Sequence, residues 1–468
     1  MRTPQVKSFT DWEAFRAHLD ELGLSIPIDR EVDPAGSLAE PVVIRDGSAG
    51  ELRVPNRFAA LPMEGWDGTE DGRPTELLRR RWSRIGAGGC GLVWGEATAV
   101  RQDGRANPNQ LLLNDETAED IAGLRTLLGQ EQVTGLQLTH SGRFARPEGQ
   151  PQPRIAYRHP LLDDRVGATD SALLSDDELD ELAGLFVDAA VLAGQAGFDF
   201  VDVKHCHGYL LHELLSAYDR PGRYGGDLSG RTLFLRTVVA GIRDRAPGLA
   251  IGVRLSLFDI VPFKPGPDGV GIPAGQGAYR FAFGGDGTGL GVDLTETHEL
   301  LSLLERLGIG LLCTTAGSPY YCPHVQRPAY FPPSDGYDPP EDPLVGVAGQ
   351  LRATAEVVRR HPALAVIGSG YTYLQDWLPN VAQAVAAKGD AQLIGLGRML
   401  LSYPNLADDV LNGRPLERRH VCRTFSDCTT APRNGLVSGC YPLDPLYKEL
   451  PERVTLAKVK AARRRTKA

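Results

Sequence analysis

The stretch Val201-Asp-Val-Lys-His-Cys-His-Gly-Tyr-Leu-Leu211 joins an apolar, β-branched segment to a cluster of titratable side chains. The apolar residues from Phe198 to Val203 predict a buried strand. Five residues of another kind follow at once: Lys204, His205, Cys206, His207 and Tyr209. Buried strands rarely end in such residues for packing reasons alone, and in an α/β barrel the carboxyl ends of the strands are where chemistry takes place. The stretch therefore predicts a barrel strand that ends in a functional site.

Eight short apolar runs recur along the chain, and amphipathic segments separate them. The runs are Phe58–Met63, Cys90–Ala97, Val133–Thr139, Phe198–Lys204, Ala250–Ser256, Ile309–Thr314, Leu364–Ser369 and Ala391–Gly397. Several are nearly all apolar, as parallel strands buried on both faces are. Helices are expected at Thr75–Ile85, Asp115–Leu128, Ser175–Ala196, Arg231–Arg245, Thr295–Leu307, Leu351–His361 and Tyr373–Ala387. The alternation predicts an α/β fold, the (β/α)8 TIM barrel, with a doubly wound sheet as the alternative.

The segments outside the barrel strands are expected to cover its ends. Residues 1–50 are predicted to be an N-terminal cover segment, with a helix over Asp11–Leu22 and irregular chain after it. The barrel is predicted to span 51–420, and a C-terminal extension with three cysteines and a basic tail to span 421–468. Two long loops, Leu257–Asp293 and Ser318–Pro343, follow barrel strands and are expected to overhang the carboxyl face as lids. Their aromatic residues offer a surface for a planar ligand: Phe258, Phe263, Tyr279, Phe281, Phe283, Tyr320, Tyr321, Tyr330 and Tyr337.

Composition argues against several kinds of partner. The chain has 468 residues, of which 42% are hydrophobic and 23% charged, as in an ordinary globular protein. Its net charge of −9 argues against nucleic acid and anionic membranes as partners. No apolar run approaches the ~20 residues that cross a bilayer. The seven cysteines, in a chain whose N-terminus lacks an apolar signal core, predict free thiols and a cytoplasmic location.

Several motifs occur in order along the expected strands. They are Pro55-Asn-Arg-Phe-Ala-Ala-Leu-Pro-Met63, Trp94-Gly-Glu-Ala-Thr-Ala-Val100, Gly135-Leu-Gln-Leu-Thr-His-Ser-Gly-Arg143, the run from Val201 to Ser216 with Arg223-Tyr-Gly-Gly226, Gly252-Val-Arg-Leu-Ser256, Ile367-Gly-Ser-Gly370 and Gly395-Leu-Gly-Arg398. Together they resemble the Old Yellow Enzyme family of FMN-dependent ene-reductase barrels, nearer the barrel domain of its 2,4-dienoyl-CoA reductase branch. The resemblance runs from Arg53 to Gly413.

The resemblance implies FMN as the cofactor and NAD(P)H as the reductant. The residues expected to hold FMN are Pro62, Met63, Ala97, Gln137, Arg254, Gly368, Gly370, Gly397 and Arg398. Glycine N–H groups together with an arginine suit the FMN phosphate, at the end of the last two strands where barrels bind phosphate. Arg254 suits the negative charge of a reduced flavin, and Gln137 suits its pyrimidine edge.

The resemblance also implies a reaction and the residues that perform it. NAD(P)H reduces the flavin, which passes hydride to the β-carbon of an electron-poor C=C bond, as in an enone or a conjugated acid. Two donors polarise the activating carbonyl, and these fall on Lys204 and His207. Tyr209 falls at the position of the tyrosine that protonates the α-carbon.

Two residues depart from the family pattern. Lys204 stands where the family has histidine, so it binds an anionic substrate oxygen, or it is desolvated and partly neutral, or His205 takes over the role. We favour the first interpretation, which points to a planar or anionic small-molecule substrate, because strand alternation puts His205 on the opposite side. Glu64 stands where many relatives carry Thr or Cys near the flavin, and a carboxylate there either opposes flavin reduction or points away.

Three cysteines, Cys422-x5-Cys428-x11-Cys440, lie beyond the barrel. Larger relatives carry four there around a [4Fe–4S] cluster, spaced C-x2-C-x3-C-x11-C. Phe425 stands where the second of the four belongs, so the sequence favours structural thiols over a cluster. A shared metal at His205 and His207 needs further ligands, because neighbouring strand positions point to opposite faces, and none stands at metal-ligand spacing; no metal site is predicted.

Other functions stay open on the sequence. The same flavin site, run oxidatively, would be a dehydrogenase or oxidase of a secondary metabolite. A barrel that binds flavin or another ligand without catalysis is a second alternative, and a metal-dependent barrel hydrolase is a third. The family includes monomers, dimers and larger rings, so a homo-oligomer is compatible with the sequence without being specified by it.

Overall fold

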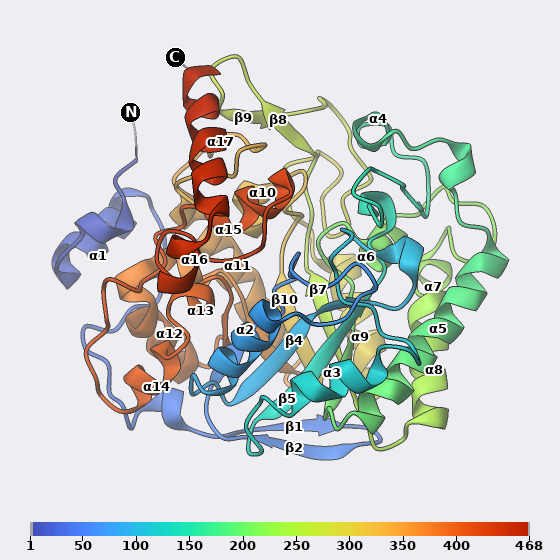
Figure 1. Cartoon of the computed structure of the whole chain (residues 1–468), viewed down its shortest axis with the longest axis horizontal. Coiled ribbons are helices and arrows are strands. Elements are labelled where there is room, and N and C mark those ends of the chain that lie inside the picture. The colour runs from blue at the N-terminus through green and yellow to red at the C-terminus, as the bar shows by residue number, and fades with distance from the viewer. Residues whose placement is uncertain (1–2, 467–468) are drawn as a thin grey trace.

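A closed barrel of eight parallel strands forms the centre of the protein (Figure 1). The computed structural model describes residues 3–466. Within this range the barrel strands are β3 (Phe58–Ala60), β4 (Leu92–Ala99), β5 (Val133–Thr139), β6 (Phe200–Val203), β7 (Ala250–Ser256), β10 (Leu311–Thr315), β11 (Ala365–Gly368) and β12 (Leu393–Leu396). The last strand pairs with the first, with Ile394 opposite Phe58, which closes the barrel. The (β/α)8 fold is confirmed, and each of the eight apolar runs overlaps one of its strands.

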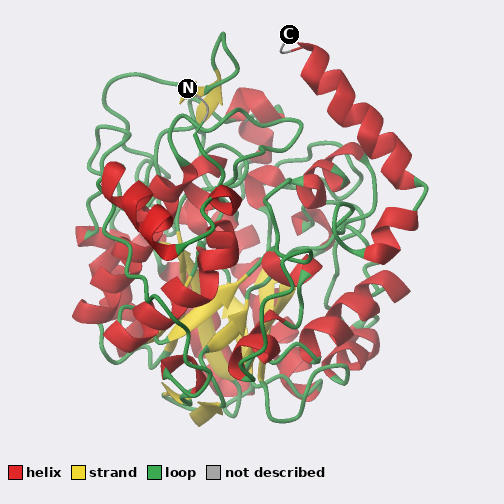
Figure 2. Ribbon diagram, turned by 90° about the vertical axis from the view of Figure 1, so that its left-hand side faces the viewer, coloured by secondary structure: helices red, strands yellow, loops and turns green. Residues whose placement is uncertain are grey.

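Helices surround the barrel, as the amphipathic segments predicted (Figure 2). They are α2 (Glu76–Gly86), α3 (Ala118–Arg125), α5 (Asp176–Gln195), α8 (Leu233–Arg245), α9 (Thr295–Arg306), α11 (Pro343–Arg360) and α12 (Leu378–Lys388). The start of α5 is set by a capping box in which Ser175 and Glu178 bond each other's backbone N–H. Helix α11 starts at Pro343 rather than at Leu351, because Asp342 caps its first turn. Shorter helices follow several strands: α4 (Asp163–Val166), α6 (Leu210–Leu214) and α7 (Leu228–Arg231).

The N-terminal cover segment contains the expected helix and also a hairpin. Helix α1 spans Trp12–Glu21. The segment after this helix, which we expected to be irregular, instead contains β1 (Val42–Asp46). This strand pairs antiparallel with β2 (Gly50–Val54). Val42, Ile44 and Val54 belong to one core with the residues that begin the barrel strands, among them Leu92, Val133, Ala250 and Leu311. The hairpin therefore closes the amino end of the barrel, at the bottom of Figure 1.

The carboxyl end of the barrel carries the long loops and the C-terminal extension. The loop after β7 holds β8 (Phe263–Pro265) and β9 (Gly271–Pro273), and the loop after β10 holds α10 (Pro323–Gln326). After α13 (Met399–Ser402) and α14 (Leu406–Leu411), the extension holds α15 (Asp427–Thr430), α16 (Pro445–Glu449) and α17 (Glu452–Thr466). The hairpin β8–β9, α10 and α17 lie at the end of the molecule away from β1 and β2 (Figure 1). Lys467, the last residue of the predicted basic tail, lies outside the described residues.

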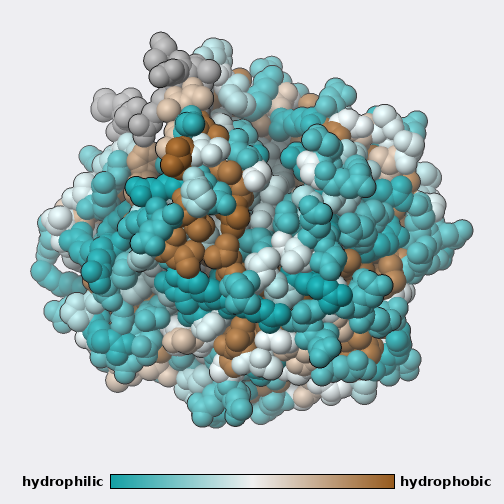
Figure 3. Space-filling view, in the orientation of Figure 1, coloured by the Kyte–Doolittle hydropathy of each residue, from teal (hydrophilic) through white to brown (hydrophobic). Residues whose placement is uncertain are grey.

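The surface gives no sign of a membrane-spanning helix. Most of the face seen in Figure 1 is hydrophilic, and its hydrophobic residues gather in a band near the centre (Figure 3). Across residues 3–466, each helix is too short or too polar to cross a bilayer.

Candidate active site

Two cavities meet at the carboxyl end of the barrel. The first, which we call the Tyr209 cavity, has a volume of about 690 Å³, and Tyr209, Lys204 and Gln137 line it. The second, which we call the Arg398 cavity, has a volume of about 870 Å³, and Arg254 and Arg398 line it. They share the lining residues Pro62, Glu64, His207, Arg327 and Thr429. The two cavities are therefore neighbours that share one wall.

The Arg398 cavity carries buried polar atoms that lack a partner. Arg398 donates through Nη2 to the Pro328 carbonyl at 3.1 Å, but its Nη1 has no partner among the described residues. The same holds for Thr315 Oγ1 and Gln326 Oε1 within residues 3–466. Gly370 has φ +98°, a conformation that glycine adopts without strain. Because buried polar groups in native proteins are almost always paired, these atoms indicate a polar ligand.

A buried carboxylate holds the strand ends beside both cavities. Asp202 on β6 accepts hydrogen bonds from Trp94 Nε1 at 3.0 Å and from the Arg254 backbone N–H at 2.8 Å, and also one from the Gln137 side-chain amide. Burial raises the pKa of Asp202 to about 6, although these hydrogen bonds act in the opposite direction. Arg254 also donates through Nη1 to the Pro62 carbonyl at 3.1 Å. The network ties Gln137 and Arg254 to one anchor.

Tyr209, Lys204 and Glu64 form a buried cluster on the Tyr209 cavity. The Tyr209 hydroxyl donates to Glu64 Oε2 at 2.7 Å and lies 2.9 Å from the Tyr320 hydroxyl. Lys204 Nζ lies 3.7 Å from the centre of the Tyr209 ring. Burial raises the pKa of Glu64 and lowers the pKa of Lys204, while the Coulombic attraction between the two opposes both shifts. Burial and the nearby Glu64 also raise the pKa of Tyr209, so it is a phenol rather than a phenolate at neutral pH.

His207 lines both cavities in an unusual backbone conformation. Its φ is 69°, in the left-handed region, and the Ser318 hydroxyl donates to its carbonyl at 2.7 Å. Its Nε2 lies 3.0 Å from the side-chain nitrogen of Gln326. Burial, together with the charges of Arg254 and Lys204, lowers the pKa of His207 well below its ordinary value. The ring is therefore neutral at neutral pH, and the strained backbone is typical of a residue placed for function.

His205 and Cys206 are buried in the same stretch. His205 Nδ1 lies 2.7 Å from the Val203 carbonyl, and its backbone N–H donates to the Arg254 carbonyl at 2.9 Å. Burial lowers the pKa of His205 to about 4 and raises the pKa of Cys206 to about 12. Both groups are therefore neutral near pH 7, and Lys204 rather than His205 faces the Tyr209 cavity.

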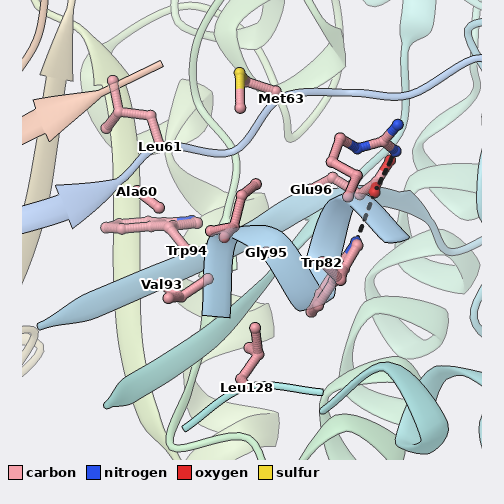
Figure 4. Close-up of a pocket in the computed structure, with 11 residues that line it drawn as sticks. Ala60, Leu61, Met63, Trp82, Val93, Trp94, Gly95, Glu96 and Leu128 are labelled. Atoms are coloured by element: carbon pink, nitrogen blue, oxygen red, sulfur yellow. Dashed lines mark hydrogen bonds and ion pairs between the residues drawn. The ribbon is translucent and has the colours of Figure 1, made fainter. Parts of the chain in front are cut away.

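Glu96 on β4, which bonds Trp82 (Figure 4), also anchors the loop that carries Glu64. Glu96 accepts hydrogen bonds from Trp82 Nε1 at 2.8 Å and from Arg81 Nη2 at 2.9 Å. Its Oε2 also accepts the Gly65 backbone N–H at 2.9 Å. This anchor fixes the residue that follows Glu64, and so it fixes the direction of the loop.

The sequence suggested that Glu64 either acts on the flavin or points away from it, and it did not indicate the hydrogen bond that Glu64 makes with Tyr209. Its carboxylate accepts the Tyr209 hydroxyl, and the two residues are 145 positions apart in the chain. Sequence reasoning had no signal for this bond, because it depends on how the loop after β3 crosses the end of β6.

The C-terminal extension forms part of the wall of the Tyr209 cavity, which the sequence did not indicate. Its lining residues are Cys428, Thr429, Pro432 and Arg433. Arg327 reaches this wall, donating to Thr429 Oγ1 at 2.6 Å and to Ser426 Oγ at 3.1 Å. Burial, with Arg398 nearby, lowers the pKa of Arg327 to about 9. A buried guanidinium held by neutral hydroxyls favours an anionic ligand.

The residues expected to hold FMN fall in three places. Pro62, Met63, Arg254, Gly370, Gly397 and Arg398 line the Arg398 cavity, and Gln137 lines the Tyr209 cavity. Ala97 lies at a bulge in β4, where its carbonyl accepts Gln110 Nε2 at 2.9 Å. Gly368 ends β11, where a Cβ would lie 2.8 Å from the Tyr371 hydroxyl. The structure thus brings six of the nine residues together at the Arg398 cavity, whereas Ala97 and Gly368 line neither cavity.

The aromatic residues of the lid loops pack mainly with each other. Tyr320 lines the Tyr209 cavity. Tyr321, Tyr279 and Phe263 instead belong to a buried core that also includes Tyr209, and the Tyr321 hydroxyl bonds Asp259. The expectation of a broad aromatic surface for a planar ligand is therefore wrong for these three residues, because their rings are buried in the lid and line neither cavity.

All seven cysteines are free thiols. Cys422 and Cys428 lie close enough to Cys440 to act on it electrostatically, and burial is the main reason that the pKa of Cys440 is raised. Over residues 3–466, no group of three or more His, Cys, Asp or Glu side chains is arranged to hold a metal ion.

Comparisons with known proteins agree with this geometry. Residues 43–272 match the NADH:flavin oxidoreductase / NADH oxidase family. The chain is 26% identical to the NADPH dehydrogenase of Bacillus subtilis (strain 168) over 378 residues, which make up 80% of this chain and 94% of that relative. The chain is thus similar to this flavin oxidoreductase family over about half of its length. The resemblance to Old Yellow Enzymes is confirmed, and FMN with NAD(P)H is the cofactor pair of this flavin oxidoreductase.

Solved structures share the fold of this flavin oxidoreductase. A 2-naphthoyl-CoA reductase in complex with 2-naphthoyl-CoA matches with a TM-score of 0.69 and 17% identity, over 89% of this chain and 58% of that chain. The Old Yellow Enzyme homologue from Zymomonas mobilis matches with a TM-score of 0.56 and 22% identity, over 81% of this chain and 93% of that chain. The chain thus spans less than two thirds of the naphthoyl-CoA reductase, and at these identities the likeness shows the fold alone.

Proposed function

We propose that the Arg398 cavity holds FMN and that the Tyr209 cavity holds an electron-poor C=C substrate, which makes the protein an NAD(P)H-dependent ene-reductase. The proposal rests on one observation: the two cavities share His207, Pro62 and Glu64 in their linings. FMN, when bound and reduced by NAD(P)H, supplies the hydride that the β-carbon of the substrate receives.

The residues of the Arg398 cavity fit FMN. The unpaired Arg398 Nη1 and the backbone of Gly370 and Gly397 suit a phosphate. A Cβ on Gly397 would lie 3.9 Å from Leu61 and would otherwise project into the cavity, so glycine leaves room for a close approach. Arg254 and Gln137, both held by Asp202, suit the charge and the hydrogen-bonding edge of the pyrimidine ring.

The residues of the Tyr209 cavity fit the polarisation and protonation of a conjugated carbonyl. Lys204 and the neutral imidazole of His207 both line the cavity as donors for a carbonyl oxygen on which negative charge develops. Tyr209 is a phenol and faces the same space, so it gives its proton to the α-carbon.

The charges around the Tyr209 cavity favour a conjugated carboxylic acid over a neutral enone. Lys204, Arg327 and Arg433 are basic residues of its wall. Arg433 pairs with Asp335, whereas Arg327 bonds two neutral hydroxyls. The acidic residue of the lining is Glu64, and burial raises its pKa. A substrate carboxylate would therefore find a basic and poorly solvated wall.

Rapid mixing under anaerobic conditions tests both parts of the proposal. NADPH is expected to bleach the flavin of the holoenzyme, and monomethyl fumarate to restore its colour at least ~10-fold more efficiently than dimethyl fumarate. In Tyr209→Phe the second step is expected to slow by about 10²–10⁴-fold. Reduced flavin that reacts with oxygen but with neither fumarate ester would overturn the ene-reductase proposal. Equal efficiency of the two esters would overturn the preference for an acid.

A further inference from the structure

Glu64 lines three cavities at once. Besides the Tyr209 and Arg398 cavities, it lines a third of about 520 Å³, which lies between α2 and the C-terminal extension. The lining of the third cavity combines the polar residues Arg80, Arg84, Ser438 and Asp444 with apolar residues such as Met63, Leu400 and Leu401. Both arginines bond the Asp444 carboxylate. Glu64 thus lines both this third cavity and the proposed substrate cavity.

We propose that Glu64 is a proton relay, which returns to Tyr209 the proton that Tyr209 gives to the substrate in each turnover. The inference rests on the proposed function. It is carried by the 2.7 Å contact between the Tyr209 hydroxyl and Glu64 Oε2, which is short enough for direct transfer. Glu64 acts through Tyr209, and it lines both the third cavity and the proposed substrate cavity.

The proton transfers balance in two linked steps. The Tyr209 O–H bond breaks as a C–H bond forms at the α-carbon of the substrate, and the phenol oxygen becomes negative. The O–H bond of protonated Glu64 then breaks, and a new O–H bond forms on Tyr209. The Glu64 carboxylate recovers a proton from water that enters through the third cavity. One solvent proton is taken up for each hydride that the reductant supplies.

The surroundings of Glu64 shift its pKa in the direction that favours the protonated form. Burial is the largest influence and raises the pKa of its carboxyl group. The charge of Glu96 acts in the same direction, whereas Lys204 and the hydrogen bonds from Tyr209 and Trp66 lower the pKa. Gln110 Nε2, at 3.4 Å from Oε2, is neutral. Since protonated Glu64 is the donor, turnover is expected to fall as the pH rises through the raised pKa of this group.

The substitution Glu64→Gln tests the relay, because an amide keeps the shape and a hydrogen bond to Tyr209 but carries no transferable acid proton. Reoxidation of the reduced flavin by monomethyl fumarate is expected to slow by about 10–100-fold and to lose the pH dependence of the wild-type protein. Glu296→Gln is the matched control, since Glu296 also accepts a tyrosine hydroxyl, that of Tyr218 at 2.9 Å, away from both cavities. The control is expected to keep the wild-type rate and profile.

Chemical rescue separates a relay from a merely structural role. In Glu64→Ala, added formic acid is expected to fill the vacated space and restore the reoxidation rate several-fold, whereas Tyr209→Phe is expected to gain nothing. Wild-type rate and pH profile in Glu64→Gln, with wild-type protein active on monomethyl fumarate, would overturn the relay alone. A wild-type protein that accepts electrons from NADPH but passes them to neither fumarate ester would overturn the proposed function and the relay with it.

Discussion

The ammonium nitrogen of Lys204 lies 3.7 Å from the centre of the Tyr209 ring, and both side chains line the same cavity. A desolvated cation over an aromatic face gains about 2 kcal/mol. The contact therefore holds the proposed proton donor and the proposed carbonyl ligand in one unit. A histidine in place of Lys204 could not keep a full charge there, since burial lowers the pKa of each of the neighbouring histidines.

The substitution Lys204→Met keeps the length of the side chain and removes its charge. We expect the KM for monomethyl fumarate to rise by about 10–100-fold, as a charge-assisted hydrogen bond is worth roughly 1.5–3 kcal/mol, while the KM for dimethyl fumarate changes little. Burial lowers the pKa of Lys204, so the wild-type KM for the acid is expected to rise with pH earlier than an ordinary lysine would allow. Lys388→Met, on an exposed ion pair with Asp390, is the control. A pH-independent wild-type KM would contradict the role of Lys204.

The substitution Arg398→Ala removes a guanidinium with an unpaired buried Nη1. We expect the affinity for FMN to fall by about 10–100-fold, because one charge-assisted contact with the phosphate is lost. Titration of FMN into the apoprotein, followed by quenching of flavin fluorescence, measures this. Arg414→Ala removes an arginine that pairs with Asp408 and Asp409 and should leave the affinity unchanged. Equal affinity for FMN in the two variants would show that Arg398 does not bind the phosphate.

Gly135 on β5 is required by the packing inside the barrel. A Cβ there would lie 2.2 Å from the Phe200 ring, which itself packs edge-on against Trp94. Gly135→Ala is therefore expected to lower the free energy of unfolding by about 1–3 kcal/mol. Gly184→Ala is the opposite case, because a Cβ on this exposed helical residue meets nothing within 4 Å, and we expect a gain of about 0.5–1 kcal/mol. Urea unfolding of both variants checks the pair, and similar effects in the two would contradict the packing argument.

Buried neutral histidines predict a loss of stability in acid. Burial lowers the pKa of His212 from 6.5 to about 3, so the unfolded chain binds a proton that the folded chain does not between these values. This contribution is fully present above pH 6.5 and is lost as the pH falls toward 3, by about 1.4 kcal/mol per pH unit. His212→Asn keeps an acceptor for the Gly208 N–H and does not titrate. The slope of the unfolding free energy against pH is expected to flatten by that amount, and an unchanged slope would show that His212 is protonated in the folded state.

Much of the fold could be predicted from local patterns in the sequence. A parallel strand buried on both faces must be apolar along its length, so all eight strands were visible as apolar runs, and the capping box at Ser175 marked the start of α5. The hairpin of β1 and β2 was not predicted, because the sequence pattern of a five-residue strand is too short to be distinguished from that of a loop. What identifies them is contact with the ends of distant barrel strands.

The residues proposed to act on the substrate were visible for the same local reason, since Lys204, His207 and Tyr209 share one strand end. Their partners were not: Glu64 is 145 positions from Tyr209, and Arg327 and the C-terminal extension reach the cavity from other parts of the chain. Strand and helix patterns depend on neighbouring residues, which the order of amino acids specifies directly. The bond between Glu64 and Tyr209, the basic wall and the packing of the lid aromatics depend on where loops cross in space, and only the closed barrel brings those loops together.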